Sequence, residues 1–243
     1  MSRPPLPAET RYWSRADDRQ RFVNQLFDRS ARHYDRASGV MALGGGQRYR
    51  REALVRAGLG TGMQVLDVGT GTGLLAREIA RLVGPNGRVV GVEPSWNMMA
   101  AARGPLHVGL VQGVGDRLPF GDARFDFVTM GYALRHVADL DRAFDEYRRV
   151  LKDGGRLLLL EITRPASRVG LAVARAYFGV LVPMMTRIAT RDGSAAELMR
   201  FYWETIAQCV PPESVLASLG RAGFKAAARA VELGIFSEYT ATR

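Results

Sequence analysis

The chain has 243 residues, a length that suits one α/β domain with a modest appended part. Apolar residues make up 47% and charged residues 24% of the sequence, which excludes a disordered chain. The 34 Lys and Arg against 24 Asp and Glu give a formal net charge of +10, spread along the chain without a compact basic tract. This distribution indicates solvated helix faces or attraction to an anionic membrane surface, and we do not expect nucleic-acid binding.

The sequence predicts neither a signal peptide nor a membrane-spanning segment. The first residues carry charge and proline but no apolar core, and the longest apolar run, Val169–Met185, is interrupted by Arg175 and Pro183. The single cysteine, Cys209, excludes an internal disulfide, and the three histidines show no metal-ligand spacing. We therefore expect a cytoplasmic protein, soluble or peripheral to a membrane, without a metal site.

The predicted elements begin with helices over residues 14–60, wrapped around a glycine-rich loop at 37–46, and we assign residues 1–60 to a helical cap. From Met63 onward short β-branched runs alternate with helical stretches, a pattern typical of a mostly parallel, doubly wound sheet over residues 61–165. Lys152–Gly155 is predicted as a turn. The predicted strands are Gln64–Val68, Arg88–Glu93, His107–Gln112, Phe125–Met130 and Arg156–Ile162, with helices at Leu74–Val83, Asn97–Arg103 and Leu140–Leu151 between them.

The C-terminal part departs from this alternation. Residues 166–209 are helical and amphipathic and are inserted after the fifth strand. A helix near Pro212–Gly220 and two strand-like runs, Phe224–Leu233 and Ile235–Thr242, complete the sheet with residues 210–243. The fold class is therefore α/β, with a Rossmann-like, seven-stranded, mostly parallel sheet that ends in an antiparallel hairpin.

A glycine-rich loop follows the first predicted strand and opens the next helix, with the spacing Asp67-x-Gly69-x-Gly71-x-Gly73. Glycines at these positions let the backbone turn sharply and let a ligand approach main-chain atoms. About 20 residues later Glu93 ends the second strand, where a carboxylate can accept both hydroxyls of a ribose. The pattern predicts a nucleoside-containing cofactor.

Asp67 separates two candidate cofactors, because Gly71–Ala76 also fits the dinucleotide fingerprint. A carboxylate just before the loop would repel a pyrophosphate, but it would favour the cationic amino-acid end of S-adenosylmethionine (SAM). The dinucleotide motif also tends to open a chain, whereas here about 60 residues precede it. The sequence therefore favours SAM over NAD(P).

Two later loops agree with this cofactor. Gly113–Phe120 follows the third strand, where an adenine-binding loop is expected, and Met130–His136 follows the fourth strand, at the edge where open α/β sheets bind ligands. The predicted cofactor-binding residues are Asp67, Gly69, Thr70, Gly71, Gly73, Glu93, Pro94, Gly115, Asp116 and Leu118.

Four motifs carry a family resemblance from Phe27 to the C-terminus. They are Phe27-Asp28-x-x-Ala31-x-x-Tyr34-Asp35, Asp116–Thr129, Ala133–His136 and Arg149–Pro165. On these motifs the chain resembles the ubiquinone/menaquinone C-methyltransferase (UbiE/MenG-type) family of class I SAM-dependent methyltransferases. The resemblance implies methyl transfer to a ring carbon of a prenylated hydroquinone or a related small phenolic.

The resemblance also implies that Tyr34 and Arg135 lie near the substrate ring. A fixed guanidinium would stabilise the phenolate that makes the ring carbon nucleophilic. His136 could take the phenolic proton, because the pKa of imidazole lies near neutrality. The alternatives are a surface charge or an ion pair for Arg135 and a packing role for Tyr34.

The chain departs from the family pattern at several positions. Ser38 replaces an Asn, Val114 replaces a polar residue of many relatives, Tyr49 replaces a Trp, and Gly234–Tyr239 replaces a histidine-containing ending. These changes suit a diverged member that methylates another small aromatic, in secondary metabolism. The alternatives are an O- or N-methyltransferase of a small molecule, and a catalytically inactive SAM-binding scaffold.

The insertion at 166–209 admits two interpretations. Helical spacing places five apolar residues on one face and three arginines near its edges. This stripe either packs on the domain or forms a mobile lid over the acceptor pocket. The apolar residues are Leu171, Ala174, Phe178, Leu181 and Met185, and the arginines are Arg168, Arg175 and Arg187.

Overall fold

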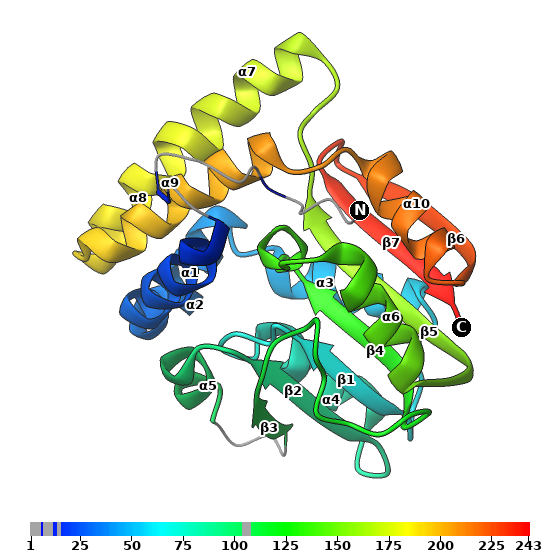
Figure 1. The fold of residues 1–243 in the computed structure, drawn as a ribbon. Helices are drawn as coiled ribbons and strands as arrows, with labels where there is room; N and C mark the ends of the chain where they lie inside the picture. Colours follow the sequence, from blue (N-terminus) through cyan, green and yellow to red (C-terminus); the bar gives the residue numbers. More distant parts are fainter. Residues whose placement is uncertain (1–5, 7–11, 14–15, 104–107) are drawn as a thin grey trace.

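Seven strands form one sheet in the order β3-β2-β1-β4-β5-β7-β6 in the computed structural model (Figure 1). The structure describes residues 6, 12–13, 16–103 and 108–243, so the predicted start of the third strand at His107 lies outside the described residues. β1 to β5 run parallel, and β7 pairs antiparallel with both β5 and β6. This confirms the Rossmann-like sheet with a C-terminal hairpin. The strands are β1 (Gln64–Val68), β2 (Arg88–Glu93), β3 (Val108–Gln112), β4 (Phe125–Gly131), β5 (Leu151–Ile162), β6 (Lys225–Glu232) and β7 (Phe236–Thr242).

β5 begins at Leu151 rather than at the predicted Arg156. The residues expected to form a turn lie inside the strand, where its pairing with β4 passes from Phe125–Leu151 to Phe127–Arg156. Gly154 has a φ of +74°, which a bulged strand accommodates most easily at glycine. The turn signal was therefore wrong, because a bulge and a turn use the same residue types.

Helices cover both faces of the sheet. α3 (Gly46–Arg56) and α4 (Leu74–Val83) pack on one face, and α6 (Leu140–Val150) and α10 (Pro212–Arg221) pack on the other. α5 (Trp96–Ala102) contacts β2 and β3. Since Ala53 and Leu54 of α3 are fully buried against the sheet, this helix packs as part of the core, although the sequence placed it in the cap.

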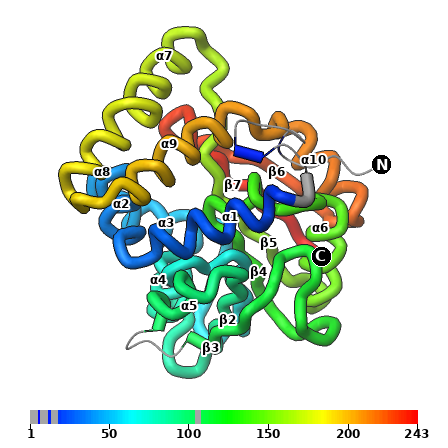
Figure 2. The backbone as a smooth tube through the Cα atoms, turned by 60° about the vertical axis from the view of Figure 1, so that its left-hand side comes forward, coloured from blue at the N-terminus to red at the C-terminus, as the bar shows by residue number. Residues whose placement is uncertain are grey.

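The first helices and the insertion share a separate hydrophobic cluster. The first helices are α1 (Ala16–Ser30), η1 (Ala31–His33) and α2 (Tyr34–Met41), and the insertion holds α7 (Arg168–Ala176), the π-helical turn η3 (Tyr177–Leu181), α8 (Val182–Thr190) and α9 (Gly193–Gln208). α1 packs against α9 and α2 against α8, as Figures 1 and 2 show. Leu26 and Ala37 thus share one core with Phe178 and Phe201.

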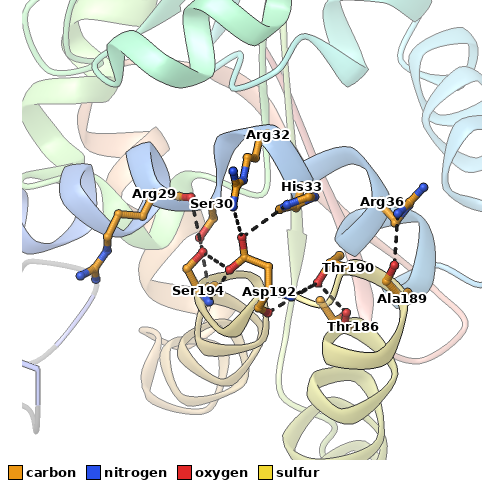
Figure 3. A network of polar contacts seen from close by, with 10 residues as sticks. All are labelled: Arg29, Ser30, Arg32, His33, Arg36, Thr186, Ala189, Thr190, Asp192 and Ser194. Atoms are coloured by element: carbon orange, nitrogen blue, oxygen red, sulfur yellow. Dashed lines mark hydrogen bonds and ion pairs between the residues drawn. The ribbon is translucent and has the colours of Figure 1, made fainter.

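A polar network ties these two segments at the turn between α8 and α9 (Figure 3). Asp192 accepts a hydrogen bond from Arg32 at 3.2 Å and lies 3.4 Å from His33 Nε2. It also accepts the Ser194 amide at 2.7 Å, which caps α9. Hydrogen bonds from Ser194 and Arg32 lower the pKa of Asp192 to about 2, so this carboxylate stays ionised at neutral pH.

The π-helical turn changes which face of the insertion is buried. Ala174 and Phe178 are buried as expected. Because the turn contains one extra residue, the next buried positions are Val182 and Thr186 instead of Leu181 and Met185. Leu181, which regular helical spacing placed on the buried face, is instead 39% exposed. The predicted stripe is therefore correct at Ala174 and Phe178 and lies one position too early from Leu181 onward.

Candidate active site

A cavity opens at the carboxyl ends of β1, β2 and β4, beneath α1, α2 and α9. One part of its wall is glycine backbone and carboxylate, and the other part is aromatic. The first part includes Gly69, Gly71, Glu93, Gly115 and Asp116, and the second includes Phe27, Tyr34, Tyr132, His136 and Tyr202. The cavity can therefore take a polar cofactor beside a flat aromatic acceptor.

The loop after β1 has the backbone that its glycines permit. Gly69, Gly71 and Gly73 have φ angles of +67°, +57° and +82°. A Cβ on Gly69 would lie 2.8 Å from the Cβ of Ala133, so the loops after β1 and β4 approach closely here. This contact brings the cofactor loop next to the segment that carries His136.

Glu93 presents its carboxylate to the cavity from the end of β2. Its oxygens accept the amide hydrogens of Gly71 and Ser95, each at 2.9 Å, and keep further lone pairs for a ligand. Burial raises the pKa of Glu93 to about 7, against the lowering effect of these two hydrogen bonds. The group therefore titrates near neutral pH.

Asp67 lies behind the glycine loop, and its contact with the cofactor stays a prediction. It is 1% exposed, accepts hydrogen bonds from the hydroxyls of Thr70 and Thr129, each at 2.7 Å, and is absent from the described wall of the cavity. Burial raises the pKa of Asp67 to about 6. Asp67 thus fixes the glycine loop from the side of the core, through its hydrogen bond with Thr70.

The other predicted cofactor residues divide in the same way. Pro94, Gly115 and Asp116 line the cavity with the residues named above, whereas Thr70, Gly73 and Leu118 are not among its described lining residues. Leu118 is buried in the core on the α6 face, and its amide donates to Glu146 at 2.7 Å. It therefore anchors the loop after β3.

Two carboxylates of the first helices bind the cofactor loops. Asp28 accepts a hydrogen bond from the Ser95 hydroxyl at 2.5 Å, in the loop after β2. Asp35 accepts from the Thr72 hydroxyl at 2.5 Å and from Arg77 at 3.0 Å, in the loop and helix after β1. Sequence reasoning missed these roles, although each carboxylate directly follows an aromatic residue that lines the cavity.

Arg135 is fully buried beside the aromatic part of the cavity and does not belong to its described lining. Its Nη1 atom donates to Glu161 at 2.5 Å and to the carbonyl of Tyr132 at 2.9 Å, and its Nε atom donates to Thr205 at 3.1 Å. The sequence left a surface charge or an ion pair as alternatives to a catalytic role, and the structure shows an ion pair that is buried inside the protein. Sequence reasoning missed Glu161 as its partner.

Arg135 reaches the cavity through Tyr202. Its guanidinium lies 4.6 Å from the centre of the Tyr202 ring, and the Tyr202 hydroxyl lies 2.9 Å from that of Tyr34. Tyr132, whose carbonyl Arg135 binds, has a φ of +61°, an uncommon conformation for a non-glycine residue. Arg135 thus stabilises the strained backbone of Tyr132 and positions the Tyr202 ring in the cavity wall.

His136 presents an unpaired imidazole in the cavity wall. Its ring stacks on Phe201 with centroids 5.5 Å apart and meets the ring of Phe27 edge-on, also at 5.5 Å. Both ring nitrogens are buried without a hydrogen-bond partner among the described residues. Burial, followed by the charges of Arg135 and Arg19, lowers the pKa of His136 well below 6.5, so the ring is neutral.

Comparison with known proteins identifies the family. The model of the ubiE/COQ5 methyltransferase family matches residues 14–243. The chain belongs to this family. A relative from Pseudomonas paraeruginosa, the ubiquinone/menaquinone biosynthesis C-methyltransferase UbiE, is 36% identical over 209 residues, which cover 83% of this chain and 80% of the relative. The corresponding protein of Hahella chejuensis is 32% identical and covers 85% of this chain and 84% of its own length.

Solved structures agree on the fold. A SAM-dependent methyltransferase from Thermotoga maritima, described as a possible histamine N-methyltransferase, superposes with a TM-score of 0.64 at 22% identity, over 90% of this chain and 98% of the other. This member of the ubiE/COQ5 family is a SAM-dependent methyltransferase with a class I fold. The prediction of SAM over NAD(P) is confirmed.

The cavity fits this cofactor. Glu93 offers carboxylate oxygens for the ribose hydroxyls, and Val114 and Met98 line the same part of the cavity with apolar surface for the adenine. Gly69 and Gly71 leave room for the amino-acid end beside their backbone. Among the described residues, no group of His, Cys, Asp or Glu side chains could hold a metal ion.

We expect the affinity for SAM to depend on the charge of Glu93. The pKa of about 7 means that the free enzyme loses the ionised form as the pH falls through 7. Affinity should then fall by up to about tenfold per pH unit below this value. Glu93→Gln should weaken binding by about 2–3 kcal/mol at pH ~8 and remove this dependence. Calorimetry from about pH 5.5 to 8.5 measures both effects, and an unchanged wild-type affinity across this range would contradict the assignment.

Removing Arg135 should destabilise the whole domain. Arg135→Ala leaves Glu161 buried without its partner, which costs about 3–5 kcal/mol. The matched control Arg221→Ala breaks an exposed pair with Asp141 and should cost less than about 1 kcal/mol. Chemical denaturation measures both values. Equal, small losses in the two variants would show that the buried pair has no structural role.

Proposed function

We propose that this enzyme transfers the methyl group of SAM to a ring carbon of a prenylated hydroquinone or a related phenolic. The observation that carries the proposal is the buried, unpaired imidazole of His136 among the rings of Phe27, Tyr34 and Tyr202. Buried polar nitrogens are rarely left without a partner, and a phenolic hydroxyl of a bound acceptor would supply one. The names of the curated relatives support the same acceptor class.

The residues of the cavity suit a ring that becomes more negative as it reacts. When bound, SAM would supply an electrophilic methyl group and leave as S-adenosylhomocysteine. The ring carbon that gains the methyl group loses its hydrogen as a proton when the ring becomes aromatic again, and the phenolate oxygen regains a proton, so that one proton is released in all. His136, being neutral, accepts the hydrogen bond of the acceptor hydroxyl and draws its proton away from the oxygen. Glu161 compensates much of the charge of Arg135, so Arg135 acts mainly by positioning the Tyr202 ring beside the resulting phenolate.

Tyr34 and Arg135 take different parts in this scheme. Tyr34 lines the cavity, and its hydroxyl can donate to the acceptor oxygen while accepting from Tyr202. Arg135 acts through Tyr202 and the Tyr132 carbonyl, so we propose it as a positioning residue rather than a group that contacts the acceptor. The aromatic rings hold the acceptor flat and exclude water.

Product analysis tests the acceptor class. The enzyme is incubated with a short-chain prenylated hydroquinone and SAM carrying an isotope-labelled methyl group, and the product is mapped by NMR. A label on a ring carbon supports the proposal. A label on oxygen or nitrogen would favour the small-molecule O- or N-methyltransferase, and no transfer to any phenolic acceptor would favour a SAM-binding scaffold.

His136→Phe should separate chemistry from packing. Phenylalanine keeps the flat ring that stacks on Phe201 but removes both nitrogens. We expect kcat to fall by about 10²-fold, the scale of general base catalysis, while the affinity for SAM changes little. The free energy of unfolding should be unchanged or larger, because two unpaired polar atoms are lost. Normal turnover in this variant would remove His136 from the mechanism.

We also propose that the first helices and residues 166–209 close over the acceptor together as a lid. They share one hydrophobic cluster and the Asp192 network of Figure 3. Asp28 and Asp35 connect this lid to the loops that would hold SAM. Binding of the cofactor should therefore stabilise the closed position of both segments.

Hydrogen exchange tests the lid. S-adenosylhomocysteine with an acceptor should slow exchange in α1–α2 and α7–α9. Asp35→Ala should weaken this response, and Asp18→Ala, which removes an exposed pair with Arg21, should preserve it. If α7–α9 in the free enzyme exchanges as slowly as Gln64–Val68, the insertion is rigid core and the lid proposal fails.

A further inference from the structure

The continuous helix formed by α7, η3 and α8 carries an exposed apolar stripe. Five large side chains along it are 53% to 75% exposed, whereas Leu66 and Leu159 of the sheet are fully buried. Leaving so much apolar surface in water is unfavourable, and such a stripe marks an interaction surface. The five residues are Val169, Val173, Val180, Met184 and Ile188.

A different face of the same helix is already occupied. Ala174, Phe178 and Val182 are buried in the cluster that joins the insertion to the first helices. Residues Arg168–Thr190 are long and apolar enough to cross a membrane, with a mean hydropathy of 1.5, but this packing holds the helix against the protein. The exposed stripe can therefore meet a surface only along its length.

The charges around the stripe select the partner. From Thr163 to Arg191 the sequence holds five arginines and no Asp or Glu. A contact between two copies of this helix would bring like charges together. An anionic phospholipid surface would instead take the valines and methionine into its interface and pair its phosphates with the arginines. The five arginines, all exposed, are Arg164, Arg168, Arg175, Arg187 and Arg191.

We propose that the exposed face of α7–α8 docks this enzyme on an anionic phospholipid bilayer, with the helix parallel to the surface. The helix also forms part of the proposed lid, so docking would bring the lid into contact with the bilayer. The proposal does not depend on which acceptor is methylated, because vesicle binding is measured without turnover.

Flotation with vesicles tests the proposal. The whole enzyme is mixed at low salt with vesicles of phosphatidylcholine alone or of equal parts phosphatidylcholine and phosphatidylglycerol. We expect binding to the anionic vesicles only, and weaker binding as salt rises. Val173→Asp should weaken it by about tenfold, the factor expected from losing the burial of one valine. Arg175→Gln should weaken it by about fivefold.

A matched control distinguishes the loss of the apolar stripe from the general effect of adding one negative charge to the protein. Val55→Asp changes a valine of similar exposure on α3, which lies against the sheet, and should bind vesicles like the wild type. Calorimetry with SAM checks that both Asp variants are folded. If Val173→Asp does not fold, Arg175→Gln tests the docking surface in its place. The proposal is overturned by three results: no binding to anionic vesicles, equal weakening by Val55→Asp, or a dimer in sedimentation that Val173→Asp dissociates.

Discussion

The ion pair between Arg135 and Glu161 lies where the carboxyl ends of β4 and β5 meet the insertion, and both side chains are almost fully buried. Burying two charges is favourable only when each finds its partner and further hydrogen bonds. Here Thr205 of α9 and the carbonyl of Tyr132 accept two further hydrogen bonds from the arginine, whereas its Nη2 atom and Oε2 of Glu161 are buried without a partner among the described residues. One guanidinium therefore positions the sheet edge, the insertion and the aromatic wall relative to one another.

The cofactor loops are held by carboxylates on two sides. Asp67 fixes the glycine loop from within the core, and Asp28 and Asp35 hold the cofactor loops from the first helices. Burial lowers the pKa of His136 and keeps the imidazole neutral, and the charge of Arg135 adds to this effect. The site is thus prepared for a ligand that brings its own hydrogen-bond donor.

Local patterns in the sequence predict most of the fold, and long-range contacts explain what they miss. The alternation of strands and helices places β1, β2 and α4 correctly, because β1 and β2 are short, mostly apolar runs that are almost continuously buried and α4 buries residues at helical spacing. The burial of Arg135 could not be predicted, since Glu161 and Thr205 come from elements that only the fold brings to it. The π-helical turn likewise shifts the insertion by one residue without a signal in the sequence.

The shared cluster of the first helices and the insertion has a consequence for synthesis of the chain. Leu26 and Ala37 leave the ribosome early, but Phe178 and Phe201, against which they pack, follow only after most of the sheet has been translated. Until then the N-terminal segment has its apolar face without its native partner. Contacts so distant in sequence form slowly, and the exposed face is open to non-native association or to chaperones in the meantime. The cavity is therefore completed among the last features of the nascent enzyme, when α9 emerges and closes over it.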